Sequence, residues 1–340
     1  MLIATRDFFV RNLKKGTFLW KVLEFFQGIL YVKNYLFYYK WNIFKSSTTR
    51  EVNIEFVSYC NLRCAFCSLD HDKPKERITP EVLEKFLENL VNDSRFKNVE
   101  VMHLHNGGET LLHPKTGELL DIIKQYKEIA RAKDKKFPAV NLLTNATPLI
   151  EKKAIEIIKS EAVDVMRFSM DGGSSQRFEE MRIGAKWDSF YKNMKFFCDE
   201  NRKNGSKIKT HIISVIDPEK PLKTNWMDKE FVNILNMVDS YELRHPHSWA
   251  GEIDIEGDSS NSMDKPHKVG CGLLMHQLVL LPCGDINVCC TDLNAKGVVG
   301  NIKENTLFDI YNSPKRRKWI ELMYQRKKSE IDLCRNCETF

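Results

Sequence analysis

From residue 52 onward the sequence alternates between short apolar strands and amphipathic helices, and this alternation leaves few folds open to the chain. Residues 52–56 alternate in polarity as a strand does, and residues 78–93 then carry a single apolar helical stripe. Further strands are expected at 99–105, 139–144, 163–169, 209–216 and 240–246, and further helices at 117–133, 150–160, 187–201 and 229–238. Repeating units of this kind predict a parallel sheet with the helices outside it.

Segments rich in cysteine, glycine and polar residues follow the first four expected strands. They are "CNLRCAFC" (60–67), "HNGGET" (105–110), "TNA" (144–146) and "SMDGG" (169–173). The carboxyl ends of parallel strands lie at one edge, both in an open sheet and in a barrel, and ligand sites collect there. The four segments therefore predict a ligand site at this edge, although strand periodicity does not separate an open sheet from a partial barrel.

The first of these segments holds three closely spaced cysteines, Cys60, Cys64 and Cys67, in the pattern C-x3-C-x2-C. A zinc site with this spacing needs a fourth ligand, for which His71 is a candidate. Iron–sulfur clusters also bind cysteine thiolates, normally one for each iron. The spacing alone leaves both open. A structural zinc site does not need three further polar loops at the same edge, so their presence favours a cofactor site.

The same segments resemble the signatures of the radical SAM enzymes, the S-adenosylmethionine (SAM) radical superfamily. The three cysteines match its C-x3-C-φ-C motif, with the aromatic Phe66 before the last cysteine. Gly107, Gly108 and Glu109 match its GGE motif at the end of the second strand. The resemblance covers residues 50 to about 250 and implies an α/β fold with a partial (β/α)6 barrel.

Less specific matches suggest how SAM is held. Asn145 and Ser169 stand where the family often contacts the methionine or ribose portion of SAM, and Arg182 resembles an arginine that some members use on the carboxylate. Glu109 is expected to accept hydrogen bonds from the methionine ammonium. The resemblance implies a [4Fe–4S] cluster whose open iron binds SAM. A reductant such as flavodoxin or ferredoxin supplies an electron, and a 5′-deoxyadenosyl radical then takes a hydrogen atom from the substrate.

A second group of cysteines follows a polar stretch past residue 250. Its pattern, C-x12-G-x4-C…C-x2-C, resembles the SPASM/twitch extension of radical SAM barrels, and the shorter twitch form implies one auxiliary [4Fe–4S] cluster. The expected ligands are Cys271, Cys289, Cys334 and Cys337. Structural zinc on these four residues stays an alternative.

Three cysteines are left over. Cys290 could replace Cys289 as a ligand. Otherwise Cys283 and Cys290 are spare thiols, either hydrogen-atom donors or buried free cysteines, of which the second is commoner. Cys198 is expected in the core, because it lies within an amphipathic helix.

The net charge of +6 is concentrated at the amino terminus, where residues 1–48 hold eight basic and two acidic residues. The rest of the chain balances 44 basic against 44 acidic residues, so no nucleic-acid partner is expected. The segment is also dense in aromatic residues, which favours helices packed on the barrel and leaves a peripheral membrane contact as the alternative. The expected regions are this helical extension at 1–48, the barrel at 49–255 and an auxiliary-cluster domain at 256–340.

No uninterrupted apolar run approaches the ~20 residues of a membrane span, and the amino terminus lacks the features of a signal peptide. We therefore expect a cytoplasmic protein, in which the ten cysteines serve metal binding or catalysis rather than disulfides.

The leading hypothesis is a radical SAM enzyme that oxidises a sugar, an aminocyclitol or a lipid-linked glycan, because a closed auxiliary cluster can accept the electron that oxidation releases. An epimerase, with a spare thiol returning the hydrogen atom, and a peptide-modifying enzyme are the alternatives within the superfamily. A non-catalytic iron–sulfur or zinc protein is the alternative class. His103 and His105 lie at the end of the second strand, and a structural role is expected for both.

Overall fold

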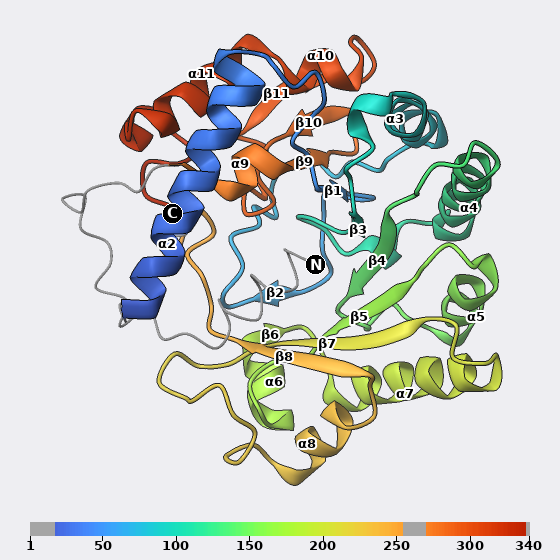
Figure 1. Ribbon diagram of the computed structural model, residues 1–340. Coiled ribbons are helices and arrows are strands. Elements are labelled where there is room, and N and C mark those ends of the chain that lie inside the picture. The colour runs from blue at the N-terminus through green and yellow to red at the C-terminus, as the bar shows by residue number, and fades with distance from the viewer. Residues whose placement is uncertain (1–17, 254–269, 338–340) are drawn as a thin grey trace.

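The central feature of the computed structural model, which describes residues 18–253 and 270–337, is a sheet that curls around an axis (Figure 1). Among the described residues, its six parallel barrel strands are β1 (Glu51–Ile54), β3 (Val101–Leu104), β4 (Ala139–Thr144), β5 (Val165–Ser169), β7 (Lys209–Val215) and β8 (Ser240–Arg244). All six lie at predicted places. The α/β class and the partial (β/α)6 barrel are thus confirmed.

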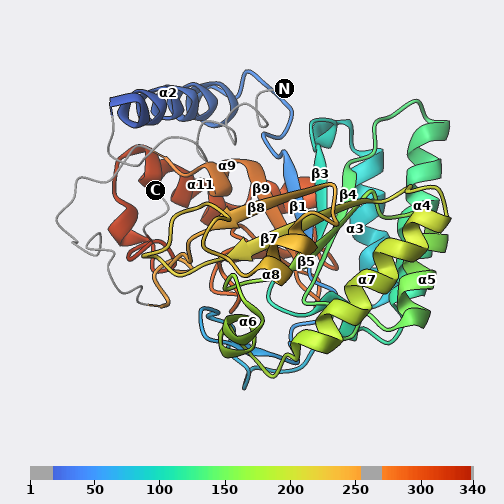
Figure 2. The ribbon, with the colours of Figure 1, turned by 90° about the horizontal axis from the view of Figure 1, so that it is seen from below.

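The helices that connect these strands cover the outside of the sheet (Figures 1 and 2). They are α3 (Pro80–Asn92), α4 (Thr116–Ala132), α5 (Glu151–Ser160), α7 (Trp187–Lys203) and α8 (Lys229–Leu235). The start of α3 follows local rules, because the Thr79 hydroxyl accepts a hydrogen bond from the Val82 amide and Pro80 occupies the first turn. Apolar side chains pack between the sheet and the helices. For example, the ring centroids of Phe168 on β5 and Phe197 on α7 are 5.7 Å apart.

Short elements near the strand ends escaped the sequence analysis. The helix α6 (Ser175–Met181) leads into β6 (Arg182–Ile183), which pairs antiparallel with β2 (Arg63–Cys64). Two-residue strands carry no detectable periodicity. The short 3-10 turns are η2 (Ser94–Phe96), η3 (Thr110–Leu112) and η4 (Lys328–Glu330).

The carboxyl-terminal segment continues the barrel sheet. It contains α9 (Gly272–His276), β9 (Gln277–Leu280), β10 (Asp285–Asn287), β11 (Val298–Asn301), α10 (Leu307–Tyr311) and α11 (Pro314–Tyr324). Strand β9 pairs in parallel with β1, and the order across the described part of the sheet is β11-β10-β9-β1-β3-β4-β5-β7-β8. The cysteine-rich segment is therefore joined to the barrel by backbone hydrogen bonds. The predicted boundary at residues 255 and 256 lies outside the described residues.

The amino-terminal segment forms α2 (Phe18–Asn34) and the π-helix η1 (Tyr35–Lys40). Its tyrosines pack on the carboxyl-terminal segment, whereas the sequence favoured helices packed on the barrel. The Tyr31 hydroxyl donates to the Ile320 carbonyl at 3.1 Å, and the Tyr35 ring stacks on Tyr324 at 4.1 Å. Figures 1 and 2 show α2 lying across these elements. Within the described ranges, no helix has both the length and the apolar character that crossing a bilayer requires.

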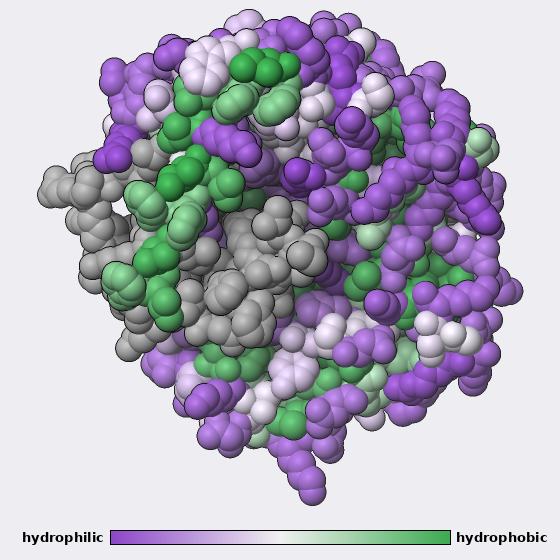
Figure 3. All heavy atoms as spheres, viewed as in Figure 1, coloured by the Kyte–Doolittle hydropathy of each residue, from purple (hydrophilic) through white to green (hydrophobic). Residues whose placement is uncertain are grey.

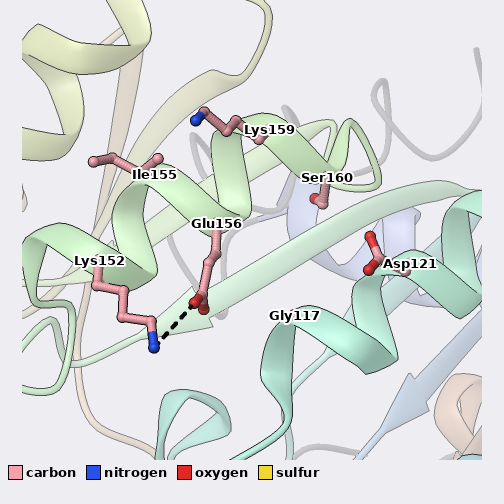
Figure 4. A pocket seen from close by; sticks show the side chains of 7 residues that line it. All are labelled: Gly117, Asp121, Lys152, Ile155, Glu156, Lys159 and Ser160. Carbon is pink, nitrogen blue, oxygen red and sulfur yellow. Dashed lines mark ion pairs between the residues drawn. The ribbon is translucent and has the colours of Figure 1, made fainter.

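A groove of about 520 Å³ lies on the outer helical layer, between α4 and α5 (Figure 4). Its lining includes Asp121 and the ion-paired Lys152 and Glu156, whose charged atoms are 3.8 Å apart. None of the predicted site residues lines this groove, so the chemistry is not expected there.

Candidate active site

The first three cysteines lie half-buried in the loop that follows β1. The Leu62 amide donates to the Cys60 sulfur at 3.4 Å, and the Cys67 amide donates to the Cys64 carbonyl at 3.2 Å. Burial, followed by the nearby carboxylate of Glu109, raises the pKa of the Cys60 thiol to about 12. Burial also raises the pKa of Cys64 and Cys67. Because metal ligation requires thiolates, a bound cluster would have to stabilise the negative sulfurs against this burial.

The short β2–β6 ribbon brings Arg182 beside the cysteines, because Cys64 and Arg182 are partners in its register. The buried guanidinium donates through Nε to Asp171 at 2.6 Å, and its Nη1 lies 3.9 Å from the Cys64 sulfur. It also lies 5.8 Å from the ring centroid of Phe66. Asp171 accepts a second hydrogen bond, from the Val215 amide at 2.6 Å. The sequence analysis did not single out this aspartate, although its segment, "SMDGG", was noted.

Glu109 is buried and turned inward, and its carboxylate is occupied by protein donors. One oxygen accepts from the Thr144 hydroxyl at 2.7 Å and the Leu111 amide at 3.1 Å, and the other accepts from the Asn145 amide at 2.8 Å. Glu109 thus ties the second polar loop to the third. The expected contact with the methionine ammonium stays a prediction, and it would use the remaining acceptor capacity of the carboxylate.

The two glycines of the GGE motif let that loop lie against the cysteine loop. A Cβ on Gly108 would stand 1.9 Å from the Val57 carbonyl oxygen, and a Cβ on Gly107 would stand 3.0 Å from the Glu55 carboxylate. Glu55 is itself buried and accepts a hydrogen bond from the Gly107 amide at 2.7 Å. At Gly108 the close approach is therefore between two stretches of backbone, and at Gly107 it is between backbone and a buried carboxylate.

Asn145 reaches the cysteine loop from the end of β4. Its Nδ2 donates to Asn61 at 3.1 Å and lies 3.7 Å from the Cys60 sulfur. Ser169 ends β5 beside Ile213 of β7 and is half-buried. The structure therefore brings every sequence-predicted residue of the first site to the carboxyl edge of the barrel strands, and Cys60, Cys64, Glu109, Asn145 and Arg182 contact or electrostatically influence one another.

The inner face of the curled sheet is polar, unlike the branched apolar filling of a closed barrel. On β3, the side chains of Met102 and Leu104 face the helices and have no exposed surface. His103 lies between them in sequence and His105 follows them, and both histidines retain some exposed surface. Among the described residues, no partner lies within hydrogen-bond distance of Nδ1 in either histidine. The expected structural role therefore lacks the hydrogen bonds at Nδ1 that would support it.

Two arginines act on these histidines across the barrel. Burial, then the charges of Arg167 and Arg244, lowers the pKa of His103 to about 3, and burial with the same neighbours holds the pKa of His105 well below its usual value. Arg244 ends β8, four strand spacings from β3, which is roughly 19 Å in a flat sheet. Its influence on both imidazoles reflects the curling of the sheet, which turns β3 and β8 toward each other.

The four carboxyl-terminal cysteines predicted as ligands come from three segments and are close enough to affect one another. Burial raises the pKa of Cys271 to about 12, with Cys289 and Cys337 adding to the effect. The pKa of Cys334 is raised by burial and then by the other three. The hairpin that delivers Cys289 turns at Gly284, whose φ of +97° explains the glycine in the motif.

The two spare thiols have other neighbours as well. The Cys290 amide donates to the Gln277 side chain at 3.0 Å, and burial followed by the nearby Cys289 raises the pKa of the Cys290 thiol. The Cys289 sulfur instead lies 3.0 Å from the Thr291 hydroxyl. Cys283 sits half-buried in the β9–β10 hairpin, near Asp285. Cys289 influences the thiols of both Cys271 and Cys334, which favours Cys289 over Cys290 as the ligand.

The segment after Cys290 contacts the first cysteine loop directly. Asn294 donates to the Ser68 carbonyl and accepts from the Asp70 amide, both at 2.9 Å. The Trp249 indole donates to the Phe66 carbonyl at 2.6 Å. Hydrogen bonds therefore join the two cysteine sites, and sequence reasoning gave no sign of them.

The donor set fits iron–sulfur chemistry at both sites. All ten cysteines are free, and the first set offers three thiols and the second four. In the described ranges, no three side chains of His, Cys, Asp or Glu are gathered closely enough to hold a single metal ion. A cluster with one cysteine per iron does not require such gathering.

Comparison with known families agrees with this geometry. Residues 54–224 match the family described as the radical SAM superfamily, and residues 271–338 match SPASM, an iron–sulfur cluster-binding domain. The chain therefore belongs to the radical SAM superfamily and carries a SPASM domain behind the barrel. Membership implies SAM and a [4Fe–4S] cluster as cofactors, with auxiliary iron–sulfur in the SPASM domain.

Two curated relatives are similar in sequence. The antilisterial bacteriocin subtilosin biosynthesis protein AlbA of Bacillus subtilis is 26% identical over 281 residues, which are 76% of this chain and 59% of AlbA. The tungsten-containing aldehyde ferredoxin oxidoreductase cofactor-modifying protein of Pyrococcus furiosus is 29% identical over 118 residues, or 35% of this chain and 30% of that protein. The chain thus spans less than two thirds of either relative.

Solved structures share the fold at lower identity. SuiB of Streptococcus suis bound to its precursor peptide SuiA superimposes with a TM-score of 0.61 at 16% identity, covering 96% of this chain and 78% of SuiB. BtrN in complex with AdoMet and 2-DOIA superimposes with a TM-score of 0.57 at 17% identity, covering 86% of this chain and 94% of BtrN.

Proposed function

We propose that this radical SAM enzyme dehydrogenates a hydroxyl-bearing polar molecule, of the sugar, aminocyclitol or lipid-linked glycan class. The observation that carries the proposal is the set of four mutually interacting cysteines, Cys271, Cys289, Cys334 and Cys337. Four thiolates fill the cysteine positions of a cubane cluster and leave none for substrate. Such a cluster suits electron transfer, and oxidation is the outcome in which the substrate must give up an electron.

Each residue of the first site then has a task. Cys60, Cys64 and Cys67 would hold the SAM-binding cluster, while Asn145 and Arg182, both beside cysteine sulfurs, orient SAM. When bound, these groups supply a 5′-deoxyadenosyl radical that takes hydrogen from carbon. Glu109 and Gly108 keep the surrounding loops together.

A dehydrogenation must place one hydrogen atom, one proton and one electron. Converting a carbinol to a carbonyl removes one hydrogen atom from carbon, one proton from the hydroxyl and one electron. The hydrogen atom would go to the deoxyadenosyl carbon, the electron to an auxiliary cluster held by the four carboxyl-terminal cysteines, and the proton to solvent. The lowered pKa values of His103 and His105 keep both imidazoles neutral on the inner face of the sheet, where a polar uncharged molecule would bind. The complex of BtrN with 2-DOIA and AdoMet gives a precedent for a small molecule on this fold.

Peptide modification is the second candidate function, and the alignment with AlbA favours it. AlbA serves the biosynthesis of a bacteriocin, and the structurally similar SuiB binds a precursor peptide. The two functions differ in what must enter the barrel, since the inner polar face offers hydrogen-bonding groups for a hydroxylated molecule, whereas a peptide needs contacts along its backbone.

The deciding experiment is a substrate screen read by 5′-deoxyadenosine. The anaerobically reconstituted protein is given SAM, a reductant and either hydroxylated small molecules or peptides, and SAM cleavage above background is quantified. A responding substrate is then turned over in D2O. Dehydrogenation gives a product that lacks two hydrogens and gains no carbon-bound deuterium. Epimerisation would instead place solvent deuterium on carbon through an exchangeable thiol, and stimulation by peptides alone would contradict the proposal.

A matched pair of variants separates the same two routes. Cys283→Ala and Cys290→Ala each remove a spare thiol and leave the four proposed ligands in place. Oxidation predicts that both variants keep the product and the rate. Loss of the product in either one would instead favour a thiol that returns a hydrogen atom.

A further inference from the structure

The amino-terminal helix has two unlike faces, and only one of them is packed. Tyr31, Tyr35 and Tyr39 are buried, whereas nine large apolar side chains of the same segment are exposed. These nine, which we call the apolar ridge, are Phe18, Leu19, Phe25, Phe26, Ile29, Leu30, Trp41, Ile43 and Phe44. Elsewhere in the described residues, only four large apolar side chains are exposed, and they are scattered. A contiguous exposed patch of this kind marks an interaction surface.

The ridge is held in place by what lies beneath it. The Tyr31 ring rests so closely on Gly270 that a Cβ there would stand 2.1 Å from a ring atom. At the end of η1, the Tyr39 hydroxyl lies 2.6 Å from that of Tyr311 and accepts a hydrogen bond from the buried Arg316 at 2.7 Å. Because the tyrosine face is fixed by these contacts, the opposite apolar face is fixed toward the outside.

The shape of the ridge fits a flat partner. Figure 3 shows α2 as an apolar band raised on a largely hydrophilic face of the protein, and Figure 2 shows the helix lying along the surface rather than projecting from it. With 17 residues, α2 is about 26 Å long. A raised apolar helix parallel to the surface is the form in which amphipathic helices enter the interface of a bilayer.

The positive charge around the apolar ridge favours an anionic partner. Lys33, Lys40 and Lys45 are exposed along it, and the Arg317 guanidinium donates to the Tyr39 carbonyl at 2.9 Å beside its end. Over residues 1–48 the sequence has eight basic and two acidic residues. Basic side chains that border an apolar helical face are attracted to anionic lipid headgroups, and each adds to the affinity.

We propose that the apolar ridge inserts into the headgroup–acyl boundary of an anionic lipid bilayer, with α2 parallel to the membrane surface. This would hold the enzyme on the membrane as a peripheral protein, with the carboxyl-terminal segment lying directly above α2. The proposal does not depend on which substrate the active site takes.

The test is co-sedimentation of the full chain with lipid vesicles. Vesicles of equal parts phosphatidylglycerol and phosphatidylcholine are expected to bind the protein, and pure phosphatidylcholine much less. The double variant Phe25→Glu with Ile29→Glu is expected to weaken binding at least about tenfold, because it places charges at the centre of the inserting face. The matched control is Ile150→Glu, a residue 54% exposed on the barrel, which should bind as the unchanged protein does.

Three outcomes would overturn the proposal. The unchanged protein could stay in the supernatant with anionic vesicles, or the double variant could bind as well as the control. The ridge could also prove to be a contact between two copies, in which case the unchanged protein would be a dimer without lipid and the double variant a monomer. Unchanged melting temperature and SAM cleavage in the double variant exclude misfolding as the cause of lost binding.

Discussion

The two cysteine sites are built in opposite ways. The first gathers Cys60, Cys64 and Cys67 from one eight-residue loop, and polar side chains from three other strand ends surround it. The second draws four cysteines from segments spread over residues 271–337, of which Cys271 belongs to the apolar core and the other three pack against it. The first set is local in sequence, and its three cysteines would leave one iron of a cubane cluster without a thiolate, so we call it the open site. The second joins distant segments with four cysteines, and we call it the closed site.

Because the two sites differ in how many chain segments they join, we expect them to contribute differently to activity and to stability. A site within one loop contributes little to holding the chain together, so its residues are free to serve chemistry. A cluster that joins three segments acts as a cross-link as well, since it restricts the unfolded chain and binds only the folded one. We therefore expect losses at the first site to appear in activity and losses at the second to appear in stability as well.

The largest expected effect is on activity, from Cys64→Ala. We expect SAM cleavage to fall at least about a thousandfold, because two thiolates do not hold the SAM-binding cluster. Iron should fall from about eight to about four per chain, while the melting temperature changes little. Deoxyadenosine by mass spectrometry, iron analysis and calorimetry check these three outcomes. Retained cleavage in a protein that has lost this iron would contradict the assignment of the first site.

Cys334→Ala tests the other half of the comparison. Iron should again fall by about half, but here the melting temperature should drop by several degrees, because a structural cluster contributes free energy to folding. SAM cleavage should persist while product formation is lost. Cys283→Ala is the control, since it removes a half-buried hairpin thiol outside the set of four. A stable Cys334→Ala protein with full iron would show that the second site is not a cross-link.

The sequence predicted the local features of both sites and missed the contacts between them. Strand periodicity predicted the parallel sheet, and the resemblance of the cysteine and glycine motifs to known signatures implied the partial barrel and the seven proposed ligands, because each motif lies within a short stretch of chain. Asp171 beneath Arg182, the Asn294 contacts with the first loop and the pairing of β9 with β1 depend on residues far apart in sequence. Such contacts follow from the packed fold, and the periodicity and motifs of one sequence read by itself contain no sign of them.

A smaller effect is expected where the GGE loop meets the cysteine loop. Gly108→Ala would place a Cβ 1.9 Å from the Val57 carbonyl oxygen, so the backbone must move, and we expect the free energy of unfolding to fall by about 3 kcal/mol. The matched control is Gly117→Ala in α4, where the nearest atom lies at 3.7 Å. That control should gain about 0.5–1 kcal/mol from helix propensity. Denaturant unfolding of both variants measures the contrast, and equal stabilities would show that the two loops are not tightly packed.

The smallest effect concerns how SAM is oriented. Asn145→Ala removes a donor beside the Cys60 sulfur, the hydrogen bond to Asn61 and the two that Asn145 accepts from the Thr147 amide and hydroxyl. We expect SAM to bind about threefold to tenfold more weakly at unchanged iron content. Titration calorimetry on the reconstituted protein measures this. Measuring Asn61→Ala and the variant that carries both substitutions shows whether Asn145 acts on SAM directly or through Asn61. If Asn145 only positions the cysteine loop through Asn61, all three proteins should lose the same affinity. If Asn145 contacts SAM itself, its variant should lose more than Asn61→Ala does, and the open site would then depend on its polar neighbours in a way that the closed site does not.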